Sequence, residues 1–267
     1  MAGAMAGGTR GTRATLEVCV EDLHGIDAAI AGGADRIELC AALGVGGLTP
    51  PASLIRAAAA ASEASGVPVH LLARPREGGF VYGPGEQALI ADDIRTAAEA
   101  GLAGIVIGAL DADHRLDLPA LAAWVAHAKA LGVARGRSLS LTLHRAFDLC
   151  RDMPEALESA VTVGFDRILT SGGAPKAVDG VEMLAALHRQ AEGRIIVLAG
   201  SGVSPETLPA ILATGVREVH ASCRLPLVAA ADPAELRFGF ASAGRAATDR
   251  DAVERLGNMV AGHPALE

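Results

Sequence analysis

Aromatic side chains are scarce in this chain: one Trp, one Tyr and five Phe occur among 267 residues. Proteins that stack single-stranded bases need such rings, so the scarcity argues against that function. Basic residues are also outnumbered, with 23 Lys and Arg against 31 Asp and Glu and a formal net charge of −8. A mildly acidic chain without a basic run suits neither nucleic acid nor an anionic membrane surface. We therefore expect no nucleic-acid partner and no membrane partner.

Long apolar runs and clustered cysteines are lacking too. No run approaches the ~18–20 residues that span a bilayer. The cysteines at positions 19, 40, 150 and 223 are scattered and form no CxxC pair, which is typical of a reduced, cytoplasmic protein. Residues 1–14 are small, Gly-rich and basic, without the apolar centre of a secretory signal. We interpret 1–14 as a disordered tail that precedes one domain over 15–267.

Short β-branched segments alternate with longer Ala-rich segments of helical spacing. The expected strands are 15–20, 35–40, 67–74, 104–110, 138–145, 166–171, 195–200 and 216–222. The expected helices are 22–32, 51–65, 86–100, 117–131, 153–164, 178–191, 204–214 and 249–261. Eight strand–helix units predict a single (β/α)8 TIM barrel. An open, doubly wound sheet is the alternative.

Charged and thiol side chains are predicted to point into the barrel from its first two strands. Apolar residues at alternate positions of these strands suit the helix layer, so Glu17, Cys19, Glu38 and Cys40 face inward. Neighbouring strands lie about 4.8 Å apart. Two carboxylates and two thiols should therefore share one corner of the interior.

Further polar residues fall at the ends of later strands: Arg74 on the third, His144 on the fifth and His220 on the eighth. Barrel interiors are normally apolar, and an unpaired buried charge is costly. One explanation is an internal ion-pair network in which Arg74 holds both glutamates. The other is a functional site at the C-terminal mouth, where barrel enzymes carry out their chemistry.

The loops after the strands extend this candidate site. Gly-rich turns follow the sixth and seventh strands, and the second leads into a helix expected to begin at Ser204, an arrangement that favours an anion. A tight turn that merely requires glycine is the alternative. The candidates for binding a substrate or anion are Arg74, Arg145, Asp148, Ser171, Gly172, Gly200, Gly202 and His220. Arg145 and Asp148 could instead form a local salt bridge that fixes their loop.

These residues allow an enzyme that acts on a small hydroxylated or phosphorylated, sugar-like substrate. Glu17 and Glu38 would share acid–base work, with His144 as a further acid–base group. Arg74 and Arg145 would hold an anionic group. The residues name no reaction, so the sequence leaves open whether the barrel is an enzyme. The Ala-rich helices likewise leave open a homo-oligomer.

Several segments together carry a family resemblance. They are 16–19 (LEVC), 32–40 (GGADRIELC), 46–50 (GGLTP), 74–76 (RPR), 78–80 (GGF), 144–148 (HRAFD), 169–172 (LTSG), 199–203 (AGSGV) and 218–220 (EVH). In this order they resemble the CutC family of TIM-barrel proteins associated with copper homeostasis.

The resemblance implies a copper-binding protein in which Cys19 and Cys40 are the Cu(I) ligands, with His220 nearby. Thiolates are good ligands for Cu(I), although two lone cysteines also fit a plain buried core. The chain departs from the family after residue 224, where it has the segment 237–240 (RFGF) in place of an aromatic-Arg-Asn segment. We expect the irregular stretch 224–248 to wrap the top of the barrel.

Overall fold

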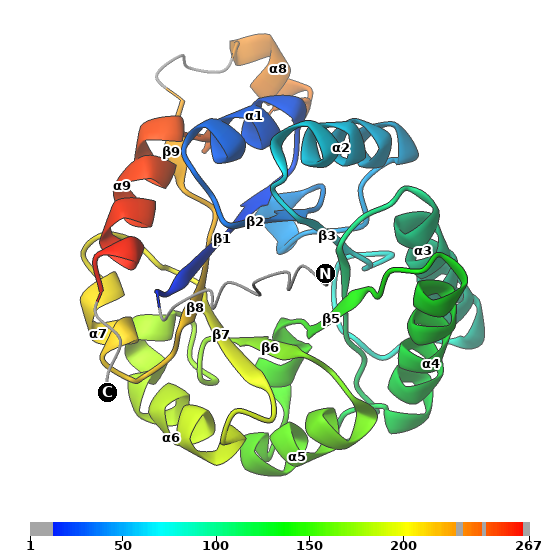
Figure 1. The fold of residues 1–267 in the computed structure, drawn as a ribbon. Helices are drawn as coiled ribbons and strands as arrows, with labels where there is room; N and C mark the ends of the chain where they lie inside the picture. Colours follow the sequence, from blue (N-terminus) through cyan, green and yellow to red (C-terminus); the bar gives the residue numbers. More distant parts are fainter. Residues whose placement is uncertain (1–12, 228–231, 242–243, 264–267) are drawn as a thin grey trace, which may run out of the picture.

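Eight parallel strands close into a barrel in the computed structural model, which describes residues 13–227, 232–241 and 244–263. The strands pair in chain order and β8 pairs back with β1, so the sheet has no open edge (Figure 1). They are β1 (Thr15–Val20), β2 (Arg36–Leu39), β3 (Val69–Leu72), β4 (Gly104–Ile107), β5 (Ser140–Leu143), β6 (Arg167–Thr170), β7 (Ile196–Gly200) and β8 (Glu218–Ala221). The predicted (β/α)8 barrel is confirmed, and the open sheet is wrong.

Helices surround the barrel and bury the outward-facing residues of the strands (Figure 1). They are α1 (Leu23–Ala31), α2 (Ala52–Ser65), α3 (Pro84–Glu99), α4 (Leu118–Ala134), α5 (Met153–Val163), α6 (Val181–Ala191), α7 (Leu208–Leu212) and α9 (Arg250–Ala261). Short 3-10 helices η1 (Leu43–Val45), η2 (Arg145–Leu149) and η3 (Ala177–Gly180) follow β2, β5 and β6. The main core therefore lies between strands and helices, which leaves the barrel interior free for polar side chains.

Aspartate caps fix where several helices begin. Asp22, Asp117, Asp152 and Asp249 each accept a hydrogen bond from the backbone N–H three residues on, which satisfies a donor the helix leaves unpaired. The helix expected to start at Ser204 is different. Helix α7 begins at Leu208, and the Ser204 hydroxyl donates to the carboxylate of Glu206 instead. The Gly-rich loop after β7 is therefore not followed directly by a helix N-terminus at Ser204, as the sequence predicted for an anion site.

Two glycines on or just after β4 make room for buried histidines. A Cβ at Gly104 would lie 2.6 Å from the ring of His70, and one at Gly108 would lie 2.5 Å from the ring of His144. Both contacts are shorter than side-chain atoms tolerate. The absence of a side chain at these two positions therefore lets rings from β3 and the end of β5 enter the barrel.

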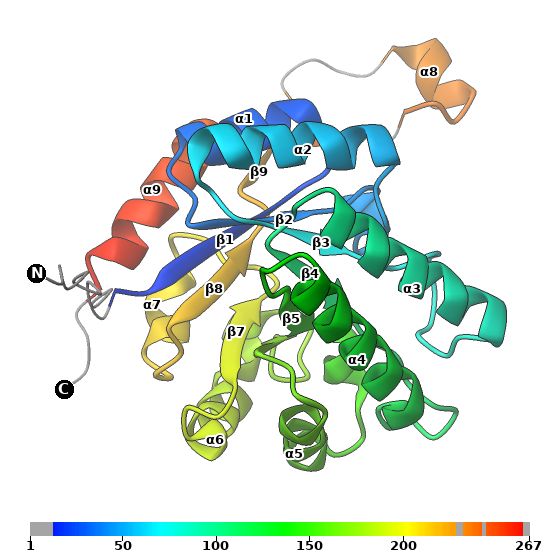
Figure 2. The same ribbon diagram turned by 45° about the vertical axis from the view of Figure 1, so that its right-hand side comes forward.

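The predicted tail 1–14 lies almost entirely outside the described residues, and the stretch 224–248 differs from its expectation. Residues 1–12 lie outside the described part, but Ala14 is fully buried and Arg13 pairs with Asp35, so the fold already includes residue 13. The strands β9 (Arg224–Pro226) and β10 (Ala246–Thr248) pair antiparallel, and α8 (Pro233–Arg237) lies between them in sequence. Helix α8 stands outside the ring of helices in both views, so this described segment does not wrap the barrel top (Figures 1 and 2).

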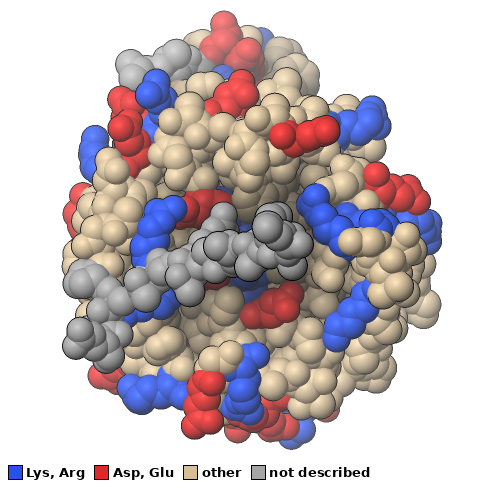
Figure 3. Space-filling model, in the orientation of Figure 1, with Lys and Arg blue, Asp and Glu red and all other residues tan. Residues whose placement is uncertain are grey.

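On the side drawn in Figure 3, Lys and Arg are interspersed with Asp and Glu, and neither sign forms a continuous field. Within the described ranges, no helix is both long and apolar enough to cross a membrane.

Candidate functional site

A cavity of about 310 Å³ opens at the C-terminal ends of the strands. The predicted site residues that line it are Cys19, Glu38, Cys40, Arg74, His144, Arg145, Gly202 and His220. The predicted residues outside its lining are Glu17, Asp148, Ser171, Gly172 and Gly200. Leu43, Leu72, Phe80, Leu169 and Val203 supply apolar wall. The mouth thus combines two thiols, a carboxyl group, two histidines and two guanidinium groups in one partly apolar space.

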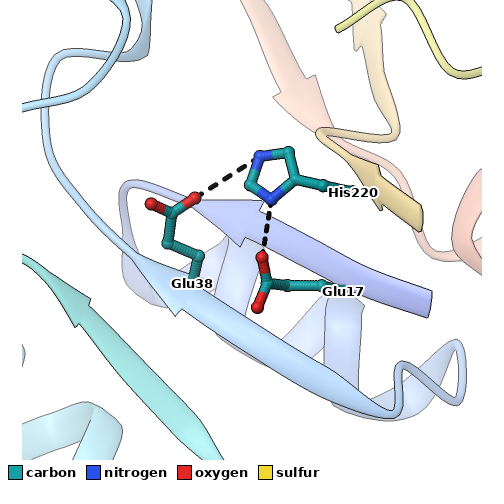
Figure 4. A group of neighbouring side chains, drawn as sticks. All are labelled: Glu17, Glu38 and His220. Carbon is teal, nitrogen blue, oxygen red and sulfur yellow. Dashed lines mark hydrogen bonds and ion pairs between the residues drawn. The ribbon is translucent and has the colours of Figure 1, made fainter. Parts of the chain in front are cut away.

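His220 joins the two buried glutamates at the base of this cavity (Figure 4). Its Nδ1 lies 2.7 Å from Oε1 of Glu17, and its Nε2 lies 3.4 Å from Oε2 of Glu38. These three residues also form a group whose ligand atoms all lie within 4.8 Å of one another. Oxygen and nitrogen donors of this kind suit a hard or borderline metal better than Cu(I). Here each donor is already engaged by another member of the group.

Although both glutamates are buried, their ionisation differs. Burial acts to raise the pKa of Glu17, but Arg36 and His220 outweigh it and hold that pKa well below its usual range. For Glu38, burial prevails over the charge of His220 and raises the pKa to about 7. Burial opposes protonation of His220, but its acidic neighbours, led by Cys19 and Glu38, raise its pKa well above the usual value. Near neutral pH the network therefore contains a Glu17 carboxylate, a His220 imidazolium and a partly protonated Glu38.

The cation that neutralises Glu17 is Arg36, not Arg74 as one interpretation of the sequence expected. Arg36 Nε donates to Glu17, and Arg36 Nη2 donates to Glu218 at 2.5 Å. Arg167 Nε also donates to Glu218, at 3.1 Å. An internal ion-pair network is therefore present, but it lies below the cavity. Arg36, Glu38 and Cys40 are alternate residues of one segment and therefore face the same side. This pattern could have identified Arg36 as an inward-facing residue from the sequence.

The two thiols reach the cavity from neighbouring strands, as predicted. In the β1–β2 register Cys19 lies opposite Glu38, so Cys40 sits two residues farther toward the mouth. Both thiols are buried, and Cys19 lies within hydrogen-bonding reach of His220. The Cys40 thiol donates to the carbonyl oxygen of Val20 at 3.3 Å, and burial raises its pKa. Cys40 is therefore a protonated thiol in this structure.

Asp148 organises the loops beside the cavity. Its carboxylate accepts hydrogen bonds from the Thr170 hydroxyl, from the backbone N–H and hydroxyl of Ser171, and from the N–H of Gly173. Arg145 Nε donates to the same carboxylate at 2.7 Å. The local salt bridge considered for Arg145 and Asp148 is thus present. Because these contacts satisfy Asp148, the loop after β6 is held to the loop after β5.

The loop glycines have different surroundings. A Cβ at Gly172 would lie 2.4 Å from the carbonyl oxygen of Gly180, so this residue allows close packing of two backbones outside the cavity. Gly202 lines the cavity, as does the neighbouring Ser201, which has a left-handed φ of 83°. Phe80 is not among the predicted site residues, yet its ring centroid lies 4.9 Å from that of His144.

A closed parallel barrel with a polar pocket at its C-terminal mouth defines the TIM-barrel class, which serves many unrelated functions. The CutC family profile matches residues 14–225, and the chain belongs to the CutC family. A CutC protein of Agrobacterium fabrum is 44% identical over 249 residues, covering 93% of this chain and 94% of that protein. A CutC protein of Caulobacter vibrioides is 47% identical over 222 residues, covering 83% of this chain and 85% of that protein.

Solved structures agree with the barrel fold, and one of them is a CutC protein. The structure of a CutC protein from Streptococcus agalactiae has a TM-score of 0.70 and 30% identity, covering 78% of this chain and 98% of that one. A thiamine phosphate pyrophosphorylase from Pyrococcus furiosus has a TM-score of 0.56 at 15% identity, covering 92% of this chain and 95% of that one. The second likeness concerns the barrel fold alone.

Proposed function

We propose that this chain binds Cu(I) in copper homeostasis, with Cys19 and Cys40 as its thiolate ligands. The observation that carries the proposal is that both thiols line one cavity in a chain of the CutC family. The name of the relative from Streptococcus agalactiae includes copper homeostasis. The family resemblance favours this function over the alternative, an enzyme that acts on a sugar-like substrate.

The chemistry of the two thiols fits this cargo. Cu(I) is a soft ion that accepts few ligands and prefers sulfur, so two thiolates in a partly apolar pocket suit it. Binding requires Cys40 to release its proton and its hydrogen bond to Val20, which is a weak interaction for a thiol. His220 lies beside Cys19 and would become a third donor only after losing a proton, because both of its ring nitrogens are engaged by glutamates.

Competition with a Cu(I)-selective chelator tests the proposal, under anaerobic conditions with ascorbate as reductant. We expect one Cu(I) per chain, with affinity reduced at least roughly 100-fold in Cys19→Ser and in Cys40→Ser, because losing even an outer-shell partner weakens metal sites 10–100-fold. Cys150→Ser is the matched control, since Cys150 is buried but does not line this cavity. Equal affinity in the parent and the Cys19→Ser/Cys40→Ser double variant would contradict the proposal.

A further inference from the structure

Arg74 is a buried guanidinium without a countercharge. Only 6% of its surface is exposed, and no carboxylate pairs with it within the described part of the chain. Its Nη1 donates to the carbonyl oxygens of Val45 and Gly47 at 2.8 and 2.9 Å, and its Nη2 donates to that of Gly78 at 3.0 Å. Its Cζ lies 5.1 Å from the centroid of the Phe80 ring. All these partners are neutral, so the positive charge is left uncompensated.

The other arginines near the barrel axis are different. Arg36 meets Glu17, and Arg145 meets Asp148. Buried charges are normally paired in this way, because an isolated charge loses its hydration without compensation. The Nε–H of Arg74 has no acceptor, and the nearby Tyr82 hydroxyl is a neutral group. No carboxylate of the described residues supplies a countercharge, which leaves the Arg74 guanidinium able to meet an anion.

His144 supplies a second unsatisfied donor beside Arg74. Only 4% of its surface is exposed, and its Nδ1 accepts a hydrogen bond from the N–H of Ala146 at 3.1 Å. This bond assigns the proton of the neutral ring to Nε2, which is buried and has no acceptor. Burial, reinforced by the charge of Arg74, keeps the ring neutral. Arg74 and His144 thus both line the same cavity, and each has one buried N–H without an acceptor.

We propose that Arg74 and His144 bind the anionic group of a small organic molecule, either a carboxylate or a phosphate. A guanidinium forms strong charge-assisted hydrogen bonds with both groups, and the histidine N–H adds a neutral donor. The cavity of about 310 Å³ accommodates a compact molecule, and Leu72, Phe80 and Leu169 provide apolar contact for its carbon atoms. The site shares the cavity with the proposed copper ligands but uses none of the same residues.

Calorimetric titration of the metal-free, reduced protein tests this site, with inorganic phosphate and glycolate as separate probes at constant ionic strength. We expect saturable one-to-one binding of at least one probe, and which probe binds distinguishes the two chemistries. Arg74→Gln and His144→Asn should each weaken binding at least tenfold. The Asn side chain can retain the acceptor for the Ala146 N–H while removing the Nε2 donor. Arg76→Gln is the matched control, because Arg76 is paired with Glu86 away from the cavity.

The result that overturns the inference is the absence of binding for both probes, or binding that survives both substitutions. If Arg74→Gln does not fold, His144→Asn decides, with circular dichroism confirming its structure. Different variants distinguish copper binding from anion binding. The Cys19→Ser/Cys40→Ser protein should keep the anion site, and His144→Asn should keep the Cu(I) affinity.

Discussion

The Nδ1 of His220 lies 2.7 Å from a carboxylate oxygen of Glu17, and this contact, together with the ion pair of Glu17 with Arg36, separates the roles of two buried glutamates. Glu17 also receives the Nε–H of Arg36, which makes it a fixed anion below the cavity. Among the described residues, the ion pair of Glu38 is the longer contact to His220, and Glu38 lines the cavity. Two residues of one chemical type therefore have pKa values shifted in opposite directions.

Removing the charge of Glu17 should strongly destabilise the barrel. Glu17→Gln leaves Arg36 and His220 without their shared anion, and breaking a buried ion pair costs roughly 3–5 kcal/mol. Urea unfolding at pH 7.5 measures the change. Glu158→Gln is the surface control, because the Glu158 pair with Arg194 is exposed, and it should change stability far less. Equal effects of the two substitutions would contradict the role given to Glu17.

Glu38→Gln, in contrast to Glu17→Gln, should stabilise the protein as the pH rises. The pKa of Glu38 rises from 4.5 to about 7 on folding, so the native state holds an extra proton between these values and parent stability falls as pH rises through them. The glutamine variant lacks this loss. Relative to the parent, it should gain on the order of 3 kcal/mol between pH 4.5 and 8. A stability difference that is independent of pH would refute the raised pKa.

His70 should make the protein sensitive to acid. Burial, with the charge of Arg36, lowers its pKa from 6.5 to about 3, so the unfolded chain binds a proton that the native state does not. Stability from this residue is complete above pH 6.5 and is lost as pH falls toward 3. His70→Gln should reduce the slope of stability against pH by up to about 1.4 kcal/mol per pH unit in this window. Glu38 changes the stability in the opposite direction, so the quantity to compare is the difference between the parent and variant curves of unfolding free energy against pH. Parallel curves would contradict a buried neutral His70.

Asp148 should be essential to loop structure but not to Cu(I) binding. Asp148→Ala leaves the backbone N–H groups of Ser171 and Gly173 without this acceptor and should destabilise the protein by roughly 3 kcal/mol, as expected when several buried hydrogen bonds are lost. The folded variant should retain the parent Cu(I) affinity, because Asp148 does not line the cavity. Chemical denaturation and chelator competition on one preparation test both statements, and a loss of affinity without a loss of stability would contradict them.

The eight strand–helix units were enough to predict the barrel, and the alternation of residues within strands predicted the inward direction of Glu38, Cys19 and Cys40. Alternation could not determine which arginine pairs with the glutamates, because the pairing depends on the position of each side chain along the barrel axis. Arg36 lies directly opposite Glu17 in the strand register, whereas Arg74 lies two residues beyond the end of β3. Register comes from the closed sheet as a whole, so a single strand does not reveal it.

The loop after β7 was harder still to predict. A hydroxyl before a proline and an acidic residue is typical of a helix start, but Ser204 uses its hydroxyl within the turn and the helix begins four residues later. Local sequence offers both hydrogen-bonding solutions, and packing of Leu208 and Ile211 into the core favours the later start.

The most direct test of the copper proposal is X-ray absorption spectroscopy of the Cu(I)-loaded protein at the copper edge. The proposal predicts two sulfur ligands for the parent and for Cys150→Ser, and the loss of one sulfur in each of Cys19→Ser and Cys40→Ser. A first shell of nitrogen and oxygen alone, unchanged by these substitutions, would show that copper does not bind at the two thiols of the barrel mouth.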